Sequence, residues 1–169
     1  AWGRFRRILW WMAGVAAAEA WYTVTATVLR EGERVQDTAG LGAEVYGIPQ
    51  GSDMYPPYIV NGRWLEPNET GRVAVISQDT AEFNNVSVGD TITLDFGEMG
   101  EADWEVIGTH QLLTSDPIST DPIYTPEAAL VDVTKKANRA NQIVVRTNKG
   151  DGDQSGDMMA ALTNRFQDN

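Results

Sequence analysis

The sequence has no cysteine and a single histidine, His110, among its 169 residues. The lack of cysteine excludes disulfides, thiolate nucleophiles and cysteine-ligated zinc. An ordinary zinc site needs several histidine or cysteine ligands, and a Ser-His-Asp triad would have to use His110 without any G-x-S-x-G elbow. We therefore expect no enzyme activity, no catalytic residue and no metal site. We expect His110 to face solvent at the end of a strand.

Nucleotide-binding patterns are missing as well, since neither G-x-G-x-x-G nor G-x-x-x-x-G-K-[ST] occurs. Positive charge is scarce, because the formal net charge is −11. Residues 1–50 hold as many bases as acids, so residues 51–169 carry the whole negative excess. An acidic surface repels phosphates, and we therefore expect no nucleic acid partner and no cofactor bound in this domain.

Long hydrophobic runs are absent too. The apolar run Ile8–Val15 is far shorter than the roughly 20 residues that a membrane-spanning helix needs. The segment 4–20 resembles a signal peptide, but the chain lacks an initiator Met, and we expect residue 1 to be a boundary inside a longer protein. Residues 2–13 predict a helix whose tryptophans and arginines suit a membrane interface, while its apolar stripe suits a core helix. The two interpretations can hold together if the helix lies just outside a membrane.

The rest of the chain alternates between strand and helix patterns. Tyr22, Val24, Ala26 and Val28 share one face of a predicted half-buried strand. The patterns predict strands at 20–29, 43–50, 72–77, 103–111 and 141–148, and helical segments at 78–85, 126–137 and 157–167. Residues 86–96 predict a turn followed by a strand with Ile92, Leu94 and Phe96 on one face. With helices at both chain ends flanking strands, we predict a mixed α+β fold in which the two ends share one sheet.

Turn and cap residues sharpen these boundaries. Asn61-Gly62 predicts a hairpin turn, followed by Trp64 and Leu65 as packing residues. Asp79 is expected to cap the helical turns at 78–85, and Pro126 to begin the next helix. Residues 113–129 contain three prolines and are expected to form an extended surface loop.

One acidic segment is similar to a calcium loop. Asp151, Asp153, Ser155, Gly156 and Asp157 match its positions 1, 3, 5, 6 and 7. Position 12 should be a bidentate Glu and is Leu162 here. We therefore expect a flexible acidic loop, with Asp157 capping the last helix, and no calcium.

Six short motifs occur in a fixed order along the middle of the chain. They are Gly62–Leu65, Val73–Ser77, Val88–Ile92, Val106–Gly108, the segment DPIYTPEAAL at 121–130 and the segment NQIVVRTN at 141–148. This order resembles the MacB-like periplasmic core domain of ABC transporter permeases of the MacB, LolC/LolE and FtsX-like type. The similarity runs over residues 44–148 and weakens at the ends, where Ala13-Gly14-Val15 replaces the family's Pro-Gly-Val.

The resemblance implies one extracytoplasmic domain, residues 1–169, looped out between two transmembrane helices. An α/β subdomain would comprise about 1–50 plus 115–169, with a β-rich subdomain inserted at about 51–114. The domain would lie on the outer side of a bacterial cell membrane, in the periplasm or at the cell surface.

The resemblance also implies a function and partners. The domain would couple ATP-driven conformational change to export or extraction of a peptide, lipoprotein, lipid or drug. Its partners would be the rest of the permease, a cytoplasmic ATPase that uses the ATP, a periplasmic adaptor and a second copy in a dimer.

Two other functions stay open at this point. The first is a free-standing secreted binding or adhesion module, which would have a signal peptide and no flanking membrane helices. The second is a hydrolase that uses His110 or a pair of acids. Flanking hydrophobic stretches of about 20 residues would favour the transporter.

Overall fold

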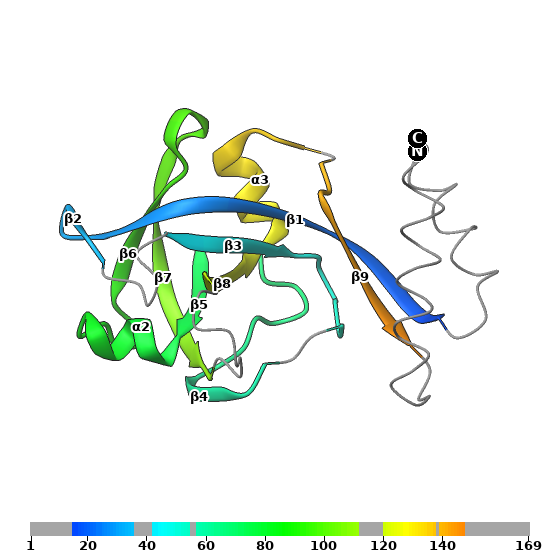
Figure 1. Ribbon diagram of the computed structural model, residues 1–169, viewed down its shortest axis with the longest axis horizontal. Coiled ribbons are helices and arrows are strands. Elements are labelled where there is room, and N and C mark those ends of the chain that lie inside the picture. Colours follow the sequence, from blue (N-terminus) through cyan, green and yellow to red (C-terminus); the bar gives the residue numbers. More distant parts are fainter. Residues whose placement is uncertain (1–14, 36–41, 55–56, 112–119, 138, 148–169) are drawn as a thin grey trace. The chain divides into compact units, whose positions relative to one another are not determined.

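The computed structural model describes residues 15–35, 42–54, 57–111, 120–137 and 139–147 (Figure 1). In chain order they form β1 (Val15–Arg30), β2 (Glu33–Arg34), β3 (Ala43–Ile48), β4 (Ile59–Gly62), β5 (Val73–Ser77), α2 (Gln78–Phe83), β6 (Thr91–Asp95), the short 3-10 helix η1 (Gly97–Met99), β7 (Glu101–His110), β8 (Asp121–Pro126), α3 (Glu127–Thr134) and β9 (Gln142–Thr147). The chain divides into two compact units, residues 1–19 with 144–169 and residues 20–143. The strand arrangement described next belongs to the second unit.

Six strands of that unit close into a ring. The hydrogen-bonded order β1-β3-β8-β5-β7 is completed by β6, which pairs with both β7 and β1. The β3–β8 and β5–β7 pairs are parallel, and the pairs of β1 with β3 and of β6 with β7 are antiparallel. In such a ring each strand has a hydrogen-bonded neighbour on both sides, although the β5–β8 pairing is limited to one position.

Side-chain alternation places the hydrophobic core on one face of these strands. The buried core cluster takes Tyr22, Ala26 and Val28 from β1 and Ile92 and Leu94 from β6. The prediction that Ile92, Leu94 and Phe96 share one face is confirmed, because all three are buried on the core side. Successive residues of a strand point to opposite faces, so a period-2 sequence pattern is enough to identify this core face.

The segment expected to be a proline-rich surface loop contains a buried strand. All six residues of β8 are buried between β3 and β5, so the loop prediction was wrong for residues 121–126. Proline has no N–H to donate, but β8 pairs with β5 at the single position Val75–Tyr124. Pro122 and Pro126 therefore lie at positions of β8 that form no pair with β5, so the missing proline N–H groups cost no hydrogen bond to that strand.

The hairpin predicted at Asn61-Gly62 was also wrong. Both residues belong to β4, which pairs antiparallel with β7 and carries a register shift between Ile59 and Asn61. Gly62 has φ +70°. Asn-Gly pairs favour such a left-handed conformation in irregular strands as well as in turns, so the dipeptide alone could not distinguish the two.

Both described α-helices start where a strand ends. The cap of α2 is Ser77, whose Oγ accepts a hydrogen bond of 3.1 Å from the Thr80 N–H, so Asp79 is not the cap as predicted. Pro126 was expected in the first turn of the next helix; it is instead the extended N-cap of α3 and the last residue of β8. Gly47 allows α3 to approach β3, since a Cβ there would lie 3.1 Å from Glu127 Cα.

The architecture is α+β, as predicted, with a mixed sheet and few helices. The division into about 1–50 plus 115–169 and about 51–114 stays a prediction. The predicted helices at 2–13 and 157–167 and the acidic segment 151–157 lie outside the described residues. Within the residues that the structure describes, no helix is both long and apolar enough to cross a membrane.

Candidate functional site

A row of aromatic rings crosses neighbouring strands. The ring centroids of Trp21 and Tyr46 are 6.3 Å apart, and those of Tyr46 and Tyr124 are 5.5 Å apart. Tyr124 also meets Trp64 at 5.2 Å and His110 at 5.1 Å, both in edge-to-face geometry. Such geometry is favourable for aromatic quadrupoles. The row therefore links β1, β3, β8 and β7 to the chain that follows β4.

His110 belongs to this row and does not face solvent as predicted. It is 1% exposed at the end of β7, and its Nε2 lies 3.0 Å from the Pro122 carbonyl oxygen. The hydrogen bond to a carbonyl means that Nε2 carries the proton. A buried imidazole held by a backbone carbonyl and a tyrosine ring serves packing, since neither group is a nucleophile that it could activate.

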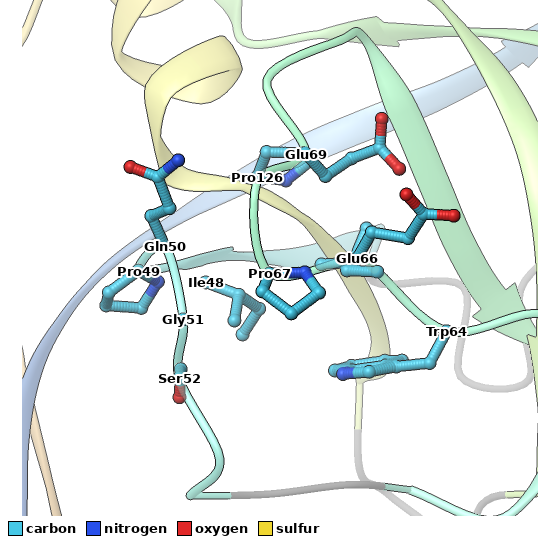
Figure 2. Close-up of a pocket in the computed structure, with 11 residues that line it drawn as sticks. Ile48, Pro49, Gln50, Gly51, Ser52, Trp64, Glu66, Pro67, Glu69 and Pro126 are labelled. Carbon is cyan, nitrogen blue, oxygen red and sulfur yellow. The ribbon is translucent and has the colours of Figure 1, made fainter.

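A small pocket lies beside the aromatic row (Figure 2). Residues 48–52 form one wall and residues 64–69 the other, and the Gly51 N–H donates to the Pro67 carbonyl at 3.0 Å to join them. The cavity measures about 40 Å³. Ligand sites for drug-sized molecules are nearer 300–1,000 Å³, so this pocket has room only for the end of one side chain or for water.

The pocket wall combines prolines, one tryptophan and an ion pair. Trp64 and Leu65 line it, and Trp64 also packs on Tyr124, as its predicted packing role requires. Arg63 Nη1 lies 2.8 Å from Glu69 Oε2 and 3.9 Å from Glu66 Oε1. The carboxylates of Glu66 and Glu69 point away from the opposite wall in Figure 2. The pocket is therefore lined by polar and apolar groups together, with the carboxylates of Glu66 and Glu69 turned away from residues 48–52.

A second, open groove of about 500 Å³ runs between α2 and β4. Its polar side chains bond to one another: Thr109 Oγ1 donates to Gln78 Oε1 at 2.6 Å, and Asn61 Nδ2 donates to the same oxygen at 3.1 Å. Gln78 Nε2 in turn donates to Glu82 Oε1 at 2.7 Å. These amides satisfy each other and hold the start of α2 against β4 and β7.

Two carboxyl groups titrate away from their ordinary range. Burial at the start of α3 raises the pKa of Glu127. The exposed Asp132 has a lowered pKa, chiefly because Lys135 donates a hydrogen bond to it, and Arg72 adds to the effect. Neither group lies in a described cluster with a nucleophile or base, so these shifts belong to helix α3 and its surface.

The described residues contain no group of three or more His, Asp or Glu side chains able to hold a metal ion. The calcium-like residues Asp151, Asp153, Ser155, Gly156 and Asp157 fall outside the described part of the chain, so the expectation of no calcium there stays a prediction. The sequence also gave no indication of the aromatic row, since its members are up to 103 positions apart and only the sheet topology brings them together.

The ring of mixed strands with two short helices places the chain in a class of α+β domains that includes solved transporter domains. It resembles the extracellular domain of the noncanonic ABC-type transporter YknZ from Gram-positive bacteria, with a TM-score of 0.63 and 20% identity over 88% of this chain and 74% of that one. It also resembles the periplasmic region of MacB from Actinobacillus actinomycetemcomitans, with a TM-score of 0.59 and 13% identity over 94% of this chain and 71% of that one.

A family model identifies the chain more specifically. The model of the MacB-like periplasmic core domain matches residues 7–164, and the chain belongs to this family. The resemblance stated from the sequence motifs is thereby confirmed. A search of curated proteins found no match.

Proposed function

We propose that the chain is the extracytoplasmic domain of an ABC transporter permease and couples ATP-driven conformational change to export or extraction of a substrate. The observation that carries this proposal is the family match over residues 7–164. The domain is proposed to act without catalysis of its own and without a bound cofactor. ATP would be hydrolysed by a separate cytoplasmic ATPase domain or subunit.

The strand pairing supports this placement. The first described strand, β1, pairs with the last described strand, β9. A chain that enters and leaves a fold on paired strands suits insertion between two transmembrane helices, because both connections then run from one pair of strands. The proposed partners are the membrane-embedded part of the permease, the ATPase, a periplasmic adaptor and a second copy of the domain.

Cysteine labelling tests the location. The chain has no cysteine, so a single Lys136→Cys substitution on its exposed surface introduces the only thiol within it. In intact cells that make the full-length protein, a membrane-impermeant maleimide should label this thiol, and the labelled protein should sediment with membranes. The matched control is the unsubstituted full-length protein, treated in the same way.

Two results would contradict the proposal. Labelling that appears only after the cells are lysed would place the domain in the cytoplasm. Labelled protein found free in the periplasm or medium would favour the secreted binding module instead.

A further inference from the structure

The groove between α2 and β4 has exposed hydrophobic side chains in its wall and next to it. Val88 lines the groove and is 43% exposed, and Phe83, which follows the lining residue Glu82 in the chain, is 70% exposed. Val60 precedes the lining residue Asn61 and is 40% exposed. A single exposed hydrophobic side chain is ordinary on a protein surface, but several beside one groove indicate a binding surface.

Polar groups of the same groove are free to bind a ligand. The Asn85 carboxamide and the Ser87 hydroxyl line it, and neither forms a hydrogen bond with another described residue. A carboxamide carries an acceptor and a donor side by side, so it can bind both groups of a peptide backbone. Among the described strands only β7 pairs with β4, so no described strand satisfies the backbone groups along the other edge of β4. The groove therefore offers hydrogen bonds to an extended backbone.

The groove also carries a negative charge. Glu82 is exposed and forms no ion pair with another described residue. Arg30 reaches the end of α2, but it lies 3.2 Å from Asp90 Oδ2 and also donates to the Asn84 carbonyl oxygen, so its charge is balanced. A partner with a basic side chain is complementary to Glu82, whereas a second copy of this acidic chain is less so.

The size and openness of the groove suit a peptide segment. Its volume of about 500 Å³ is comparable with that of ligand sites, roughly 300–1,000 Å³, but such sites usually enclose most of the ligand. An open groove covers only one side of its ligand. An extended segment suits such a groove, because alternate side chains point to one face and can all contact the groove.

We propose that the groove between α2 and β4 binds an extended segment of a partner polypeptide that carries apolar and basic side chains. The apolar side chains of the segment contact Val88 and Phe83, and a basic side chain pairs with Glu82. Its backbone bonds to Asn85 and Ser87, as main-chain hydrogen bonds do in other modes of peptide recognition. The inference concerns a surface of the second compact unit alone and does not depend on the proposed coupling to ATP hydrolysis.

NMR titration of the 169-residue chain tests this binding with synthetic peptides. The probe is a capped hexapeptide of alternating valine and lysine, and the charge control has glutamate in place of each lysine. The valine-lysine peptide should shift the amide resonances of residues 81–88 until they saturate. The valine-glutamate peptide should bind about fivefold more weakly or worse, because its charges repel Glu82.

Three variants identify the contacts. Val88→Ser should weaken binding of the valine-lysine peptide about fivefold, because an apolar contact is lost. Ile143→Ser is the matched control, since Ile143 is also 43% exposed but belongs to β9 and does not line the groove. It should leave the affinity unchanged. Glu82→Gln should weaken binding about threefold, as expected for an exposed ion pair, and should reduce the preference for lysine over glutamate.

Several results would overturn the proposal. Resonances of residues 81–88 that do not shift, or equal binding of the two peptides, would show that the groove does not select a basic segment. Equal losses in Val88→Ser and Ile143→Ser would place the peptide elsewhere. Shifts that depend on the concentration of the chain without any peptide, and that Val88→Ser removes, would show that a second copy occupies the groove instead.

Discussion

At the scale of single residues, two glycines allow β4 and β7 to approach each other. A Cβ on Gly62 would lie 2.2 Å from the Ile107 carbonyl oxygen, and a Cβ on Gly108 would lie 2.3 Å from the Arg63 carbonyl oxygen. Both distances are far below any real contact of a Cβ with an oxygen. Gly62 also has φ +70°, so a side chain there would meet a steric clash and an unfavourable backbone conformation together.

Gly62→Ala should therefore lower the free energy of unfolding by about 2–4 kcal/mol, from the left-handed backbone and the clash together. The matched control is Gly97→Ala, because Gly97 has φ +63° but no atom within 4 Å of its Cβ position. That variant should lose only about 1 kcal/mol, the backbone cost alone. Urea denaturation measures both. Equal losses in the two variants would show that β4 can move away from β7 at no cost.

The same residues show what local sequence could predict. The alternation of Ile92, Leu94 and Phe96 identified a core face, because burial on one side of a strand depends on a period that the sequence displays directly. Gly62 was identified as a special backbone position, but its partner strand was not. Ile107 is 45 positions further along the chain, and nothing near Gly62 in the sequence indicates that contact.

At the scale of elements, the start of α2 tests where a helix is capped. Ser77 is buried and its hydroxyl holds the Thr80 N–H, whereas Asp79 is exposed within the first turn. Ser77→Ala should cost about 1 kcal/mol of stability, the usual loss for an N-cap, while Asp79→Ala should cost a few tenths through the helix dipole. Thermal unfolding of the two variants measures the difference. A larger loss for Asp79→Ala would restore the cap that the sequence predicted.

The elements also show why part of the candidate site was missed. The prolines of β8 predicted a loop, since proline is generally depleted in strands. Because of that prediction, Tyr124 was not recognised as a buried residue at the centre of the aromatic row. His110 was expected to face solvent because it ends a strand, but Tyr124 and the Pro122 carbonyl of β8 lie against its ring. Both errors have the same cause. Segments distant in the sequence bury these residues, and local sequence propensity gives no information about such contacts.

At the scale of the whole molecule, the closed ring combines strands from both parts of the predicted domain division. β1, β3 and β8 belong to the predicted α/β subdomain, while β5, β6 and β7 belong to the predicted β-rich insert. Two seams join them, the β5–β8 pair and the β1–β6 pair. If these two strand pairs stabilise the ring enough, the ring unfolds as one cooperative unit, and the two predicted subdomains do not unfold independently.

Ile123→Ala in β8 decides between these outcomes. Ile123 is 2% exposed within the core cluster, so its truncation should cost about 2–5 kcal/mol. If the ring is one cooperative unit, amides in β3 and β7 should then exchange faster by the same factor, because both open only when the whole ring opens. Pro49→Ala, outside the strands of the ring, is a control that should leave both nearly unchanged. If the exchange rate instead rises only in β3 and the β7 amides stay protected, residues 51–114 fold as a subdomain that is independent of the rest of the ring.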